Sequence, residues 1–175
     1  APTLISGNPN YVKKIIFPLE TLGIMVSGSA LFHGLISVII LLGFEMIVNG
    51  NIPGTILLLP IVWIPLILSC LGMTWILATA GVLIRDINQL MGSIISMFMF
   101  LSPIFYPTTA LPEKLQWMAK VNPLAQSIEY TRAVLIRGEI PSGIKIATEI
   151  IIGVVWCEIC FRILKNMQSS FGDRL

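Results

Sequence analysis

The sequence predicts an all-α membrane protein with four membrane-crossing helices and a re-entrant helical hairpin before the last of them. A helix needs about 20 apolar residues to cross the hydrocarbon core of a bilayer. Three long stretches carry no charged residue, at positions 21–44, 46–84 and 87–112, and a fourth apolar segment occupies 145–164. The composition agrees, because 55% of the residues are hydrophobic and 11% are charged, whereas soluble domains carry about 25% charged residues.

A short amphipathic segment, residues 8–20, precedes the first membrane helix. It places a basic pair beside apolar residues and is too short and too charged to cross a bilayer. The first membrane helix is predicted over 21–44, and it is expected to end at Glu45 and the turn that follows. Small residues at two four-residue spacings would let a neighbouring helix come close; the small residues of this helix are Gly23, Ser27, Ala30 and Gly34.

The second membrane helix is predicted over 55–84. At a rise of about 1.5 Å per residue it would reach roughly 45 Å, which exceeds a hydrocarbon thickness of about 30 Å. Pro60 and Pro65 are therefore expected to kink or interrupt its first half. The polar pair Arg85-Asp86 ends this helix, and a third membrane helix is predicted over 88–105.

The region from 107 to 145 mixes charged and apolar residues, and it contains two predicted helices, 112–121 and 123–137. Neither helix is long enough to span a bilayer. We therefore predict a re-entrant hairpin over 112–137; the alternative is a surface loop with an interfacial helix. The second helix is amphipathic and should end at Gly138. Its apolar stripe is Leu124, Ile128 and Leu135, and its polar side is Gln126, Glu129, Tyr130 and Arg137.

The last membrane helix, 145–164, contains two acidic residues, Glu149 and Glu158. Their spacing puts them on opposite faces, so they do not form a paired carboxylate site. A basic residue one turn away is expected to neutralise each of them, Lys145 for Glu149 and Arg162 for Glu158.

The residues also argue against several classes of function. The net charge of +2 comes from scattered basic residues, which argues against nucleic-acid binding. Cys157 and Cys160 have the spacing of a redox or metal pair, but no second pair occurs, so they are interpreted as small apolar helix residues. The lone histidine, His33, is expected to hydrogen-bond a neighbouring helix rather than to act in catalysis.

No pattern typical of a catalytic, metal or cofactor site occurs in the sequence. It lacks the glycine-rich phosphate loop of P-loop proteins, the His-Glu-x-x-His zinc motif and the Gly-x-Ser-x-Gly motif of hydrolases. We therefore predict that the chain is not an enzyme and binds no cofactor itself. Any chemistry would belong to a partner chain.

Four segments share their order and spacing with a known family. They are residues 8–20, with Lys13, Lys14, Phe17, Pro18 and Glu20; Arg85-Asp86-Ile87; Leu101–Pro107, followed by Leu111-Pro112, Asn122-Pro123-Leu124 and Arg132; and the tail Phe171-Gly-Asp-Arg-Leu175. Through these segments the chain resembles the permease subunit of the ABC-2 type exporters that move O-antigen, capsule and teichoic acid polysaccharides out of bacteria. Gly172 and Arg174 depart from the family's tail.

The resemblance covers residues 8–175, roughly the last two-thirds of a typical member. Members of the family have six membrane helices after an amphipathic helix. This chain begins without Met, so it is expected to be N-terminally truncated and to hold the last four membrane helices.

The resemblance implies a multi-pass protein of the bacterial inner membrane. Two permease copies would form a homodimer around a path for a polysaccharide or lipid-linked glycan. Each copy would dock a separate ABC ATPase that binds ATP and magnesium, and no nucleic acid would take part. The residues implied to couple to the ATPase are Lys13, Lys14, Phe17, Pro18, Glu20, Arg85 and Asp86; the alternative is that they are anchors facing the lipid headgroups.

The resemblance also implies a translocation path and an outer gate. Aromatic rings suit the path because they stack on sugar faces. The candidates are Phe98, Phe100, Phe105 and Tyr106, with helix packing or an interfacial belt as the alternative. The hairpin would gate or shape the exit through Trp117, Asn122, Pro123, Glu129 and Arg132. Within it, Glu129 and Arg132 are expected to form a structural pair.

Three other functions remain open. An ABC-2 permease for a drug, haem or another small molecule is the nearest, although the basic pair followed by Phe17-Pro18 and the tail argue against it. A membrane enzyme acting on lipid-linked sugars should show acidic or histidine clusters in external loops, and none occurs. The third possibility is a structural scaffold protein.

Overall fold

The computed structural model describes residues 20–50, 52–84, 86–102 and 122–168 of the chain. Every regular element in these ranges is helical, as predicted, and no strand occurs among them. The elements are α3 (Glu20–Asn49), the 3-10 helix η1 (Gly54–Leu58), α4 (Leu59–Leu83), α5 (Ile87–Leu101), α7 (Pro123–Arg132), the π-helical turn η3 (Ala133–Arg137) and α8 (Gly143–Gln168).

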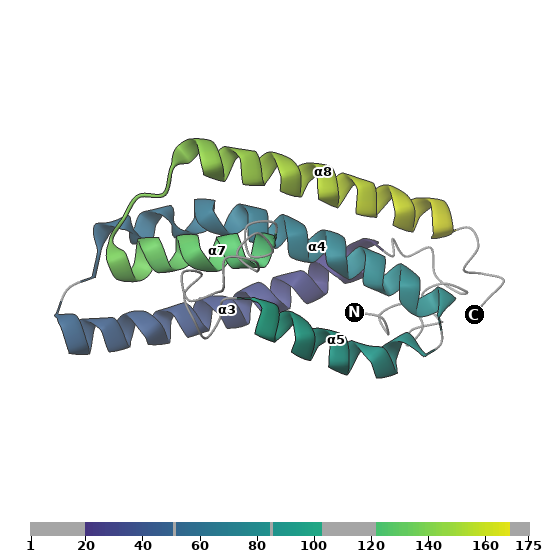
Figure 1. Ribbon diagram of the computed structural model, residues 1–175, viewed down its shortest axis with the longest axis horizontal. Helices are drawn as coiled ribbons and strands as arrows, with labels where there is room; N and C mark the ends of the chain where they lie inside the picture. Colours follow the sequence, from purple (N-terminus) through teal and green to yellow (C-terminus); the bar gives the residue numbers. More distant parts are fainter. Residues whose placement is uncertain (1–19, 51, 85, 103–121, 169–175) are drawn as a thin grey trace.

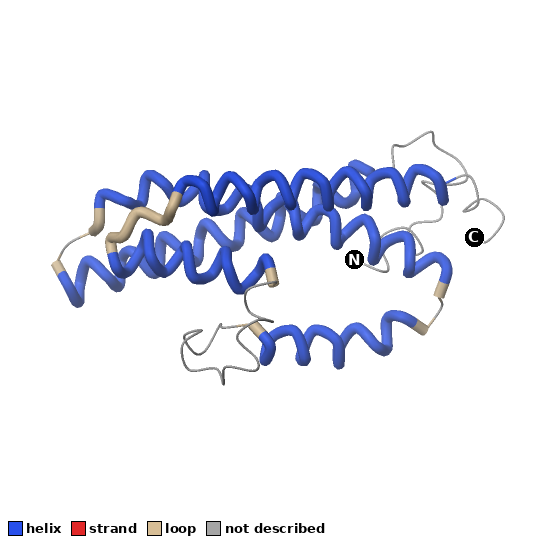
Figure 2. Tube along the Cα trace, turned by 45° about the horizontal axis from the view of Figure 1, so that its top comes forward, coloured by secondary structure: helices blue, strands red, loops and turns tan. Residues whose placement is uncertain are grey.

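The long helices lie side by side along one axis (Figure 1). Helices α3, α5 and α7 run in one direction, and α4 and α8 run back. Helix α4 is central, since α3, α7 and α8 all pack on it, and α7 lies beside its first half (Figures 1 and 2). The connections α3–α4 and α7–α8 are therefore at one end of the bundle. The end of α4 and the start of α5 are at the other end.

Helix α3 is longer than the predicted span of 21–44. It continues through Glu45 to Asn49, because glutamate is a good helix former and does not end a helix by itself. The helix ends where Gly50 adopts a left-handed conformation with a φ of 70° and donates its N–H to the Met46 carbonyl at 3.1 Å. Glycine is the residue that takes this conformation most readily.

The predicted helix 55–84 is divided into η1 and α4. Pro60 lies in the first turn of α4, where the N–H that proline lacks would have no partner within the helix. The change from the 3-10 helix η1 to the α-helix α4 therefore comes before Pro60. Pro65 lies inside α4, and the α-helix continues through it, so the expected interruption there does not occur. Helix α5 ends at Leu101 rather than at 105, and α8 extends beyond the predicted 145–164 at both ends.

Glycines facing tryptophans form the close helix contacts. A Cβ on Gly23 would lie 2.5 Å from Nε1 of Trp75, and one on Gly72 would lie 2.7 Å from the Trp156 ring. A Cβ on Gly34 would lie 3.6 Å from the Trp63 ring, which is an ordinary van der Waals distance. The predicted stripe of small residues therefore holds α3 against α4, except for Ala30, which is exposed.

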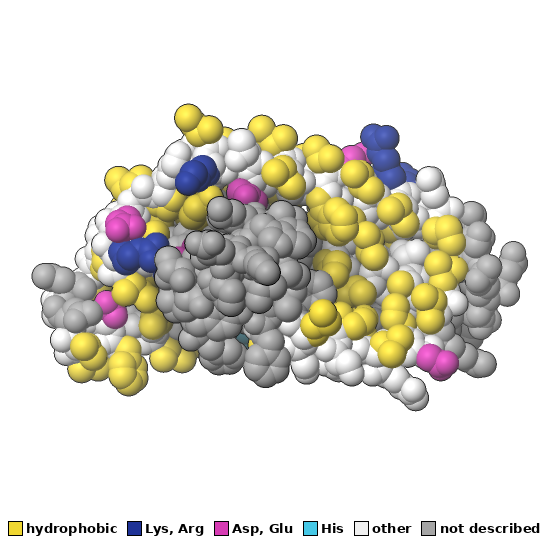
Figure 3. Space-filling model, viewed as in Figure 1, with side chains coloured by type: hydrophobic (Ala, Val, Ile, Leu, Met, Phe, Trp, Pro, Cys, Tyr) yellow, Lys and Arg dark blue, Asp and Glu magenta, His cyan; other side chains and the backbone are white. Residues whose placement is uncertain are grey.

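The described surface is strongly apolar. In Figure 3 hydrophobic side chains cover much of the described surface, and the charged side chains lie mainly toward its two ends. Phe32, Ile39 and Phe44 of α3 are each more than 60% exposed. Two segments of the described chain, Glu20–Val48 and Gly54–Leu83, are long and apolar enough to cross a bilayer. A surface of this kind is stable in lipid and would aggregate in water, so this is a membrane protein.

Candidate functional site

Asn122 joins the end of α5 to the start of α7. Its Oδ1 accepts the N–H of Leu124 at 3.0 Å, which caps α7. Its Nδ2 donates to Oγ of Ser102 at 3.2 Å, and Ser102 is almost completely buried. Pro123 follows as the first residue of α7, a position that suits its fixed φ. One predicted gate residue, Asn122, thus positions α7 relative to α5.

Helix α7 and η3 are also fixed to α4 and η1. The hydroxyl of Thr55 donates to the carbonyl of Val134 at 2.7 Å, and Nε1 of Trp63 donates to Oγ1 of Thr131 at 3.3 Å. Val134 is fully buried, and it packs with Val62 of α4 and Ile146 of α8. The element is therefore held at its start by Asn122 and along its length by α4.

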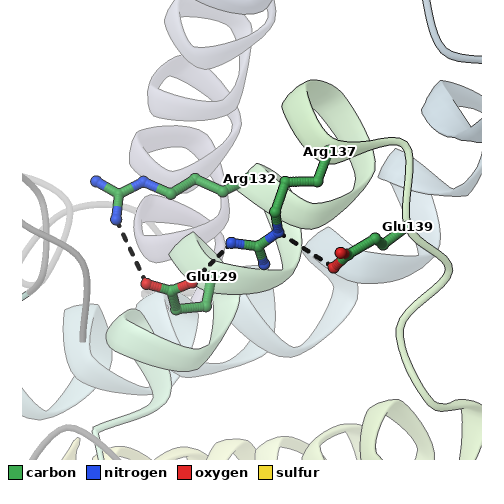
Figure 4. Close-up of polar contacts among 4 residues, drawn as sticks. All are labelled: Glu129, Arg132, Arg137 and Glu139. Carbon is green, nitrogen blue, oxygen red and sulfur yellow. Dashed lines mark hydrogen bonds and ion pairs between the residues drawn. The ribbon is translucent and has the colours of Figure 1, made fainter. Parts of the chain in front are cut away.

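Four charged residues at the end of this element form one ionic cluster (Figure 4). Glu129 forms ion pairs with Arg132 at 3.4 Å and with Arg137 at 3.7 Å, and Arg137 also pairs with Glu139 at 3.1 Å. The pair Glu129–Arg132 is confirmed. The roles of Arg137 and Glu139 were not predicted, because the spacing rule for helical pairs joins residues three or four positions apart and not positions 129 and 137. Two acids and two bases leave the cluster without net charge.

The polar side predicted for 123–137 is only partly correct. Tyr130 packs against the cluster of Val62, Val134 and Ile146, which brings together α4, η3 and the start of α8. Burial and, to a lesser degree, the Glu149 carboxylate raise the pKa of the Tyr130 hydroxyl.

Of the two ion pairs predicted for the last helix, one is present. Arg162 pairs with Glu158 at 2.8 Å, but Lys145 and Glu149 form no ion pair in the described structure. The Thr148 hydroxyl donates to the backbone carbonyl of Lys145 at 2.7 Å.

The opposite end of the bundle contains the described part of the predicted coupling set. The Glu20 carbonyl accepts Nε1 of Trp75 at 3.0 Å, which ties the start of α3 to α4. Asp86 is exposed, and its carbonyl accepts the N–H of Gln89 at 3.1 Å in the first turn of α5. Lys13, Lys14, Phe17, Pro18 and Arg85 lie outside the described residues.

Most of the predicted path residues are not described. Phe105, Tyr106 and Trp117 lie outside the described ranges, and for Phe98 and Phe100 only the backbone of α5 is described. His33 is exposed and makes an edge-on contact with Phe32. The expected interhelical hydrogen bond from its ring is absent among the described residues.

The cysteine pair 157–160 lies on α8. Cys160 is fully buried, and its Sγ lies 3.2 Å from where a Cβ on Gly72 would be. Its position within the α4–α8 contact is that of a small packing residue, in agreement with the interpretation from the sequence.

Comparison with known proteins gives one family. The profile of the family described as ABC-2 type transporter matches residues 1–136. Two Klebsiella pneumoniae proteins named O-antigen export system permease protein RfbA are 27% and 26% identical over 137 residues, which is 75% of this chain and 51% of each relative. A Myxococcus xanthus protein of the same name is 20% identical over 173 residues, 98% of this chain and 66% of the relative. The chain thus spans about half to two-thirds of the length of these relatives.

Proposed function

This chain belongs to the ABC-2 type transporter family, and from that premise we propose that it is the permease subunit of an ATP-driven exporter of a polysaccharide or lipid-linked glycan across the bacterial inner membrane. The observation that carries the proposal is the family match over residues 1–136, together with relatives named as O-antigen export permeases. The apolar helical bundle supports it, because such a surface requires a bilayer.

In the proposed architecture α3, α4, α5 and α8 cross the membrane, and α7 with η3 enters it without crossing. The alternating helix directions support this arrangement (Figure 1). Helix α7 has 10 residues, too few for a crossing, and its anchoring to α4 satisfies the requirement that non-spanning backbone at membrane depth be surrounded by protein. The end with the α3–α4 and α7–α8 connections is the outer end.

The inner end would then contact a separate ABC ATPase that binds ATP and magnesium. The location of Glu20 and Asp86 supports this assignment, because α3 begins and α5 follows α4 at that end. Lys13, Lys14, Phe17, Pro18 and Arg85 are adjacent to them in sequence and would complete the coupling surface. A second permease copy would complete the path in a homodimer.

Copurification with the ATPase tests this proposal. The full-length protein should bring down an ATPase with a P-loop motif, and the double variant Lys13→Glu with Lys14→Glu should lose most of that ATPase, because two charge reversals would face its docking groove. The matched control is Lys145→Glu, an exposed lysine at the start of α8, near the opposite end, which should retain the ATPase.

Equal ATPase recovery from the double variant and from wild type would refute the coupling assignment. Deletion of the gene should also remove a glycan from the cell surface. Loss of small-molecule export with an unchanged surface glycan would instead identify an ABC-2 permease for small molecules.

A further inference from the structure

The π-helical turn η3 accommodates one residue more than an α-helical turn would. Glu129 and Arg137 are eight positions apart, which in an α-helix of 3.6 residues per turn would leave them roughly 80° apart around the axis. In the structure they form an ion pair at 3.7 Å. Because a π-helical hydrogen bond encloses one more residue than an α-helical one, the turn Ala133–Arg137 absorbs the extra residue and brings position 137 back toward the face of position 129.

The backbone hydrogen bonds of η3 have a second arrangement available. The N–H groups of Gly138 and Glu139 both donate to the Ala133 carbonyl. The Val134 carbonyl is thus left to another donor, and the Thr55 hydroxyl donates to it at 2.7 Å. In an α-helical turn, the Gly138 N–H would donate to the Val134 carbonyl four positions earlier and take the place of the Thr55 hydroxyl.

Contacts from side chains hold the π-helical form. Such turns are rare and are frequently found at functional sites. Here the Thr55 hydroxyl of η1 occupies the Val134 carbonyl. Arg137 bridges Glu129 and Glu139 across the end of the turn (Figure 4). Because the Val134 carbonyl has a donor in either form, the two forms differ little in backbone hydrogen bonding, which is the condition for an element with two packings.

We propose that η3 is a register switch, in which the π-helical turn of this structure converts to an α-helical turn. Conversion would exchange the Thr55 hydroxyl for the Gly138 N–H at the Val134 carbonyl. It would also rotate Arg137 away from Glu129 and open that ion pair. The switch goes beyond the proposed function, because it follows from the backbone of this element whether or not the chain exports a glycan.

The segment that the switch would move is the connection between α7 and α8. Helix α7 is hydrogen-bonded to α4 before the turn begins, whereas the connection 138–142 follows the turn directly. Gly138 lies against η1, since a Cβ on it would be 3.5 Å from Cβ of Pro53. A change of register in η3 would therefore leave α7 in place and displace the connection relative to η1, at the end of the bundle that we assign to the outside.

Distances between two spin labels test the switch in the full-length protein in lipid nanodiscs. The labels are attached at Leu57→Cys in η1 and Ile140→Cys in the connection, whose native side chains are 83% and 75% exposed. The background is the protein in which the three native cysteines are alanine. The distance in this labelled protein represents the π-helical form.

Three variants of the labelled protein then separate the two forms. Deletion of Ile136, an exposed residue of η3, removes the extra residue and should give the single distance of the α-helical form. Thr55→Val removes the donor that only the π-helical form uses, so it should raise the ratio of the second distance to the first roughly 5- to 30-fold. The matched control, Thr55→Ser, keeps the hydroxyl and should keep the distribution of the labelled protein.

A second, discrete distance with valine and not with serine at position 55 supports the switch, and its agreement with the deletion variant identifies the α-helical form. A distribution for Thr55→Val that is unchanged would overturn the inference. One that only broadens, without a discrete second distance, would overturn it as well, because η3 would then unfold locally rather than change register. The comparison of valine with serine decides the question even if the deletion variant does not fold.

Discussion

Trp75 is held by three different contacts. Its Nε1 donates to the Glu20 carbonyl at 3.0 Å, its ring packs on Phe161 with centroids 5.2 Å apart, and its Nε1 and Cδ1 atoms lie close to Gly23. The small-residue spacing predicted the close approach at Gly23. It did not identify the indole as the partner, because nothing in the local sequence relates position 23 to position 75.

Gly23→Ala should destabilise the protein. The new Cβ would lie 2.5 Å from Nε1 of an indole that is 6% exposed and hydrogen-bonded, so the ring cannot easily move away. Overpacking of this kind costs about 1–3 kcal/mol. The measurement is the thermal unfolding midpoint of the detergent-solubilised protein.

The control for this substitution is Gly28→Ala on the same helix. A Cβ there meets nothing within 4 Å, and alanine has a higher helix propensity than glycine by about 1 kcal/mol. Its midpoint should therefore stay the same or rise. Equal decreases in both variants would contradict the role assigned to the Gly23–Trp75 contact.

At the scale of elements, α7 with η3 depends on contacts from distant parts of the chain. The sequence predicted that this element ends at Gly138, and Gly138 indeed has a φ of 65°. It did not predict the π-helical turn at Ala133–Arg137, nor that Thr55 would satisfy the Val134 carbonyl at 2.7 Å. A π turn shifts the backbone hydrogen-bond register, and only a neighbour in space can compensate for that.

Thr55→Val should loosen this element. The substitution preserves the shape of the side chain and removes the donor to a buried carbonyl, which costs about 1–2 kcal/mol. Trypsin should then cleave after the exposed Arg137 roughly 5- to 30-fold faster, since cleavage follows the population of the open form.

Thr148→Val is the control for this prediction. The Thr148 hydroxyl bonds to a carbonyl of its own helix on an exposed surface, so its loss should leave the cleavage at Arg137 unchanged. If Thr55→Val also left that rate unchanged, the Thr55–Val134 contact would not be what holds η3 in place.

At the scale of the whole molecule, the helix directions give the bundle two distinct ends. One end carries Ser142 before α8, and the other carries Asp86 before α5 (Figure 1). Both residues are exposed. In the proposed orientation, the first end is outside the inner membrane and the second is in the cytoplasm.

Single cysteines at these two positions should therefore label from opposite sides. With the three native cysteines replaced by alanine, Ser142→Cys should react with an impermeant maleimide applied to right-side-out vesicles, and Asp86→Cys only in inverted vesicles. The cysteine-free protein provides the background. Labelling of both positions in the same vesicle preparation would contradict the arrangement of crossings.

The sequence by itself determined the helical membrane class, the approximate positions of the helices and the glycine stop at 138, because these follow from local composition and periodicity. It could not determine that α3 continues through Glu45, that Tyr130 is covered by apolar neighbours, or that Glu149 is not paired with Lys145. Tertiary structure decided these points, together with the Asn122–Ser102 and Thr55–Val134 contacts. The physical reason is that each depends on which helix packs beside another, and that choice is made between residues far apart in the chain.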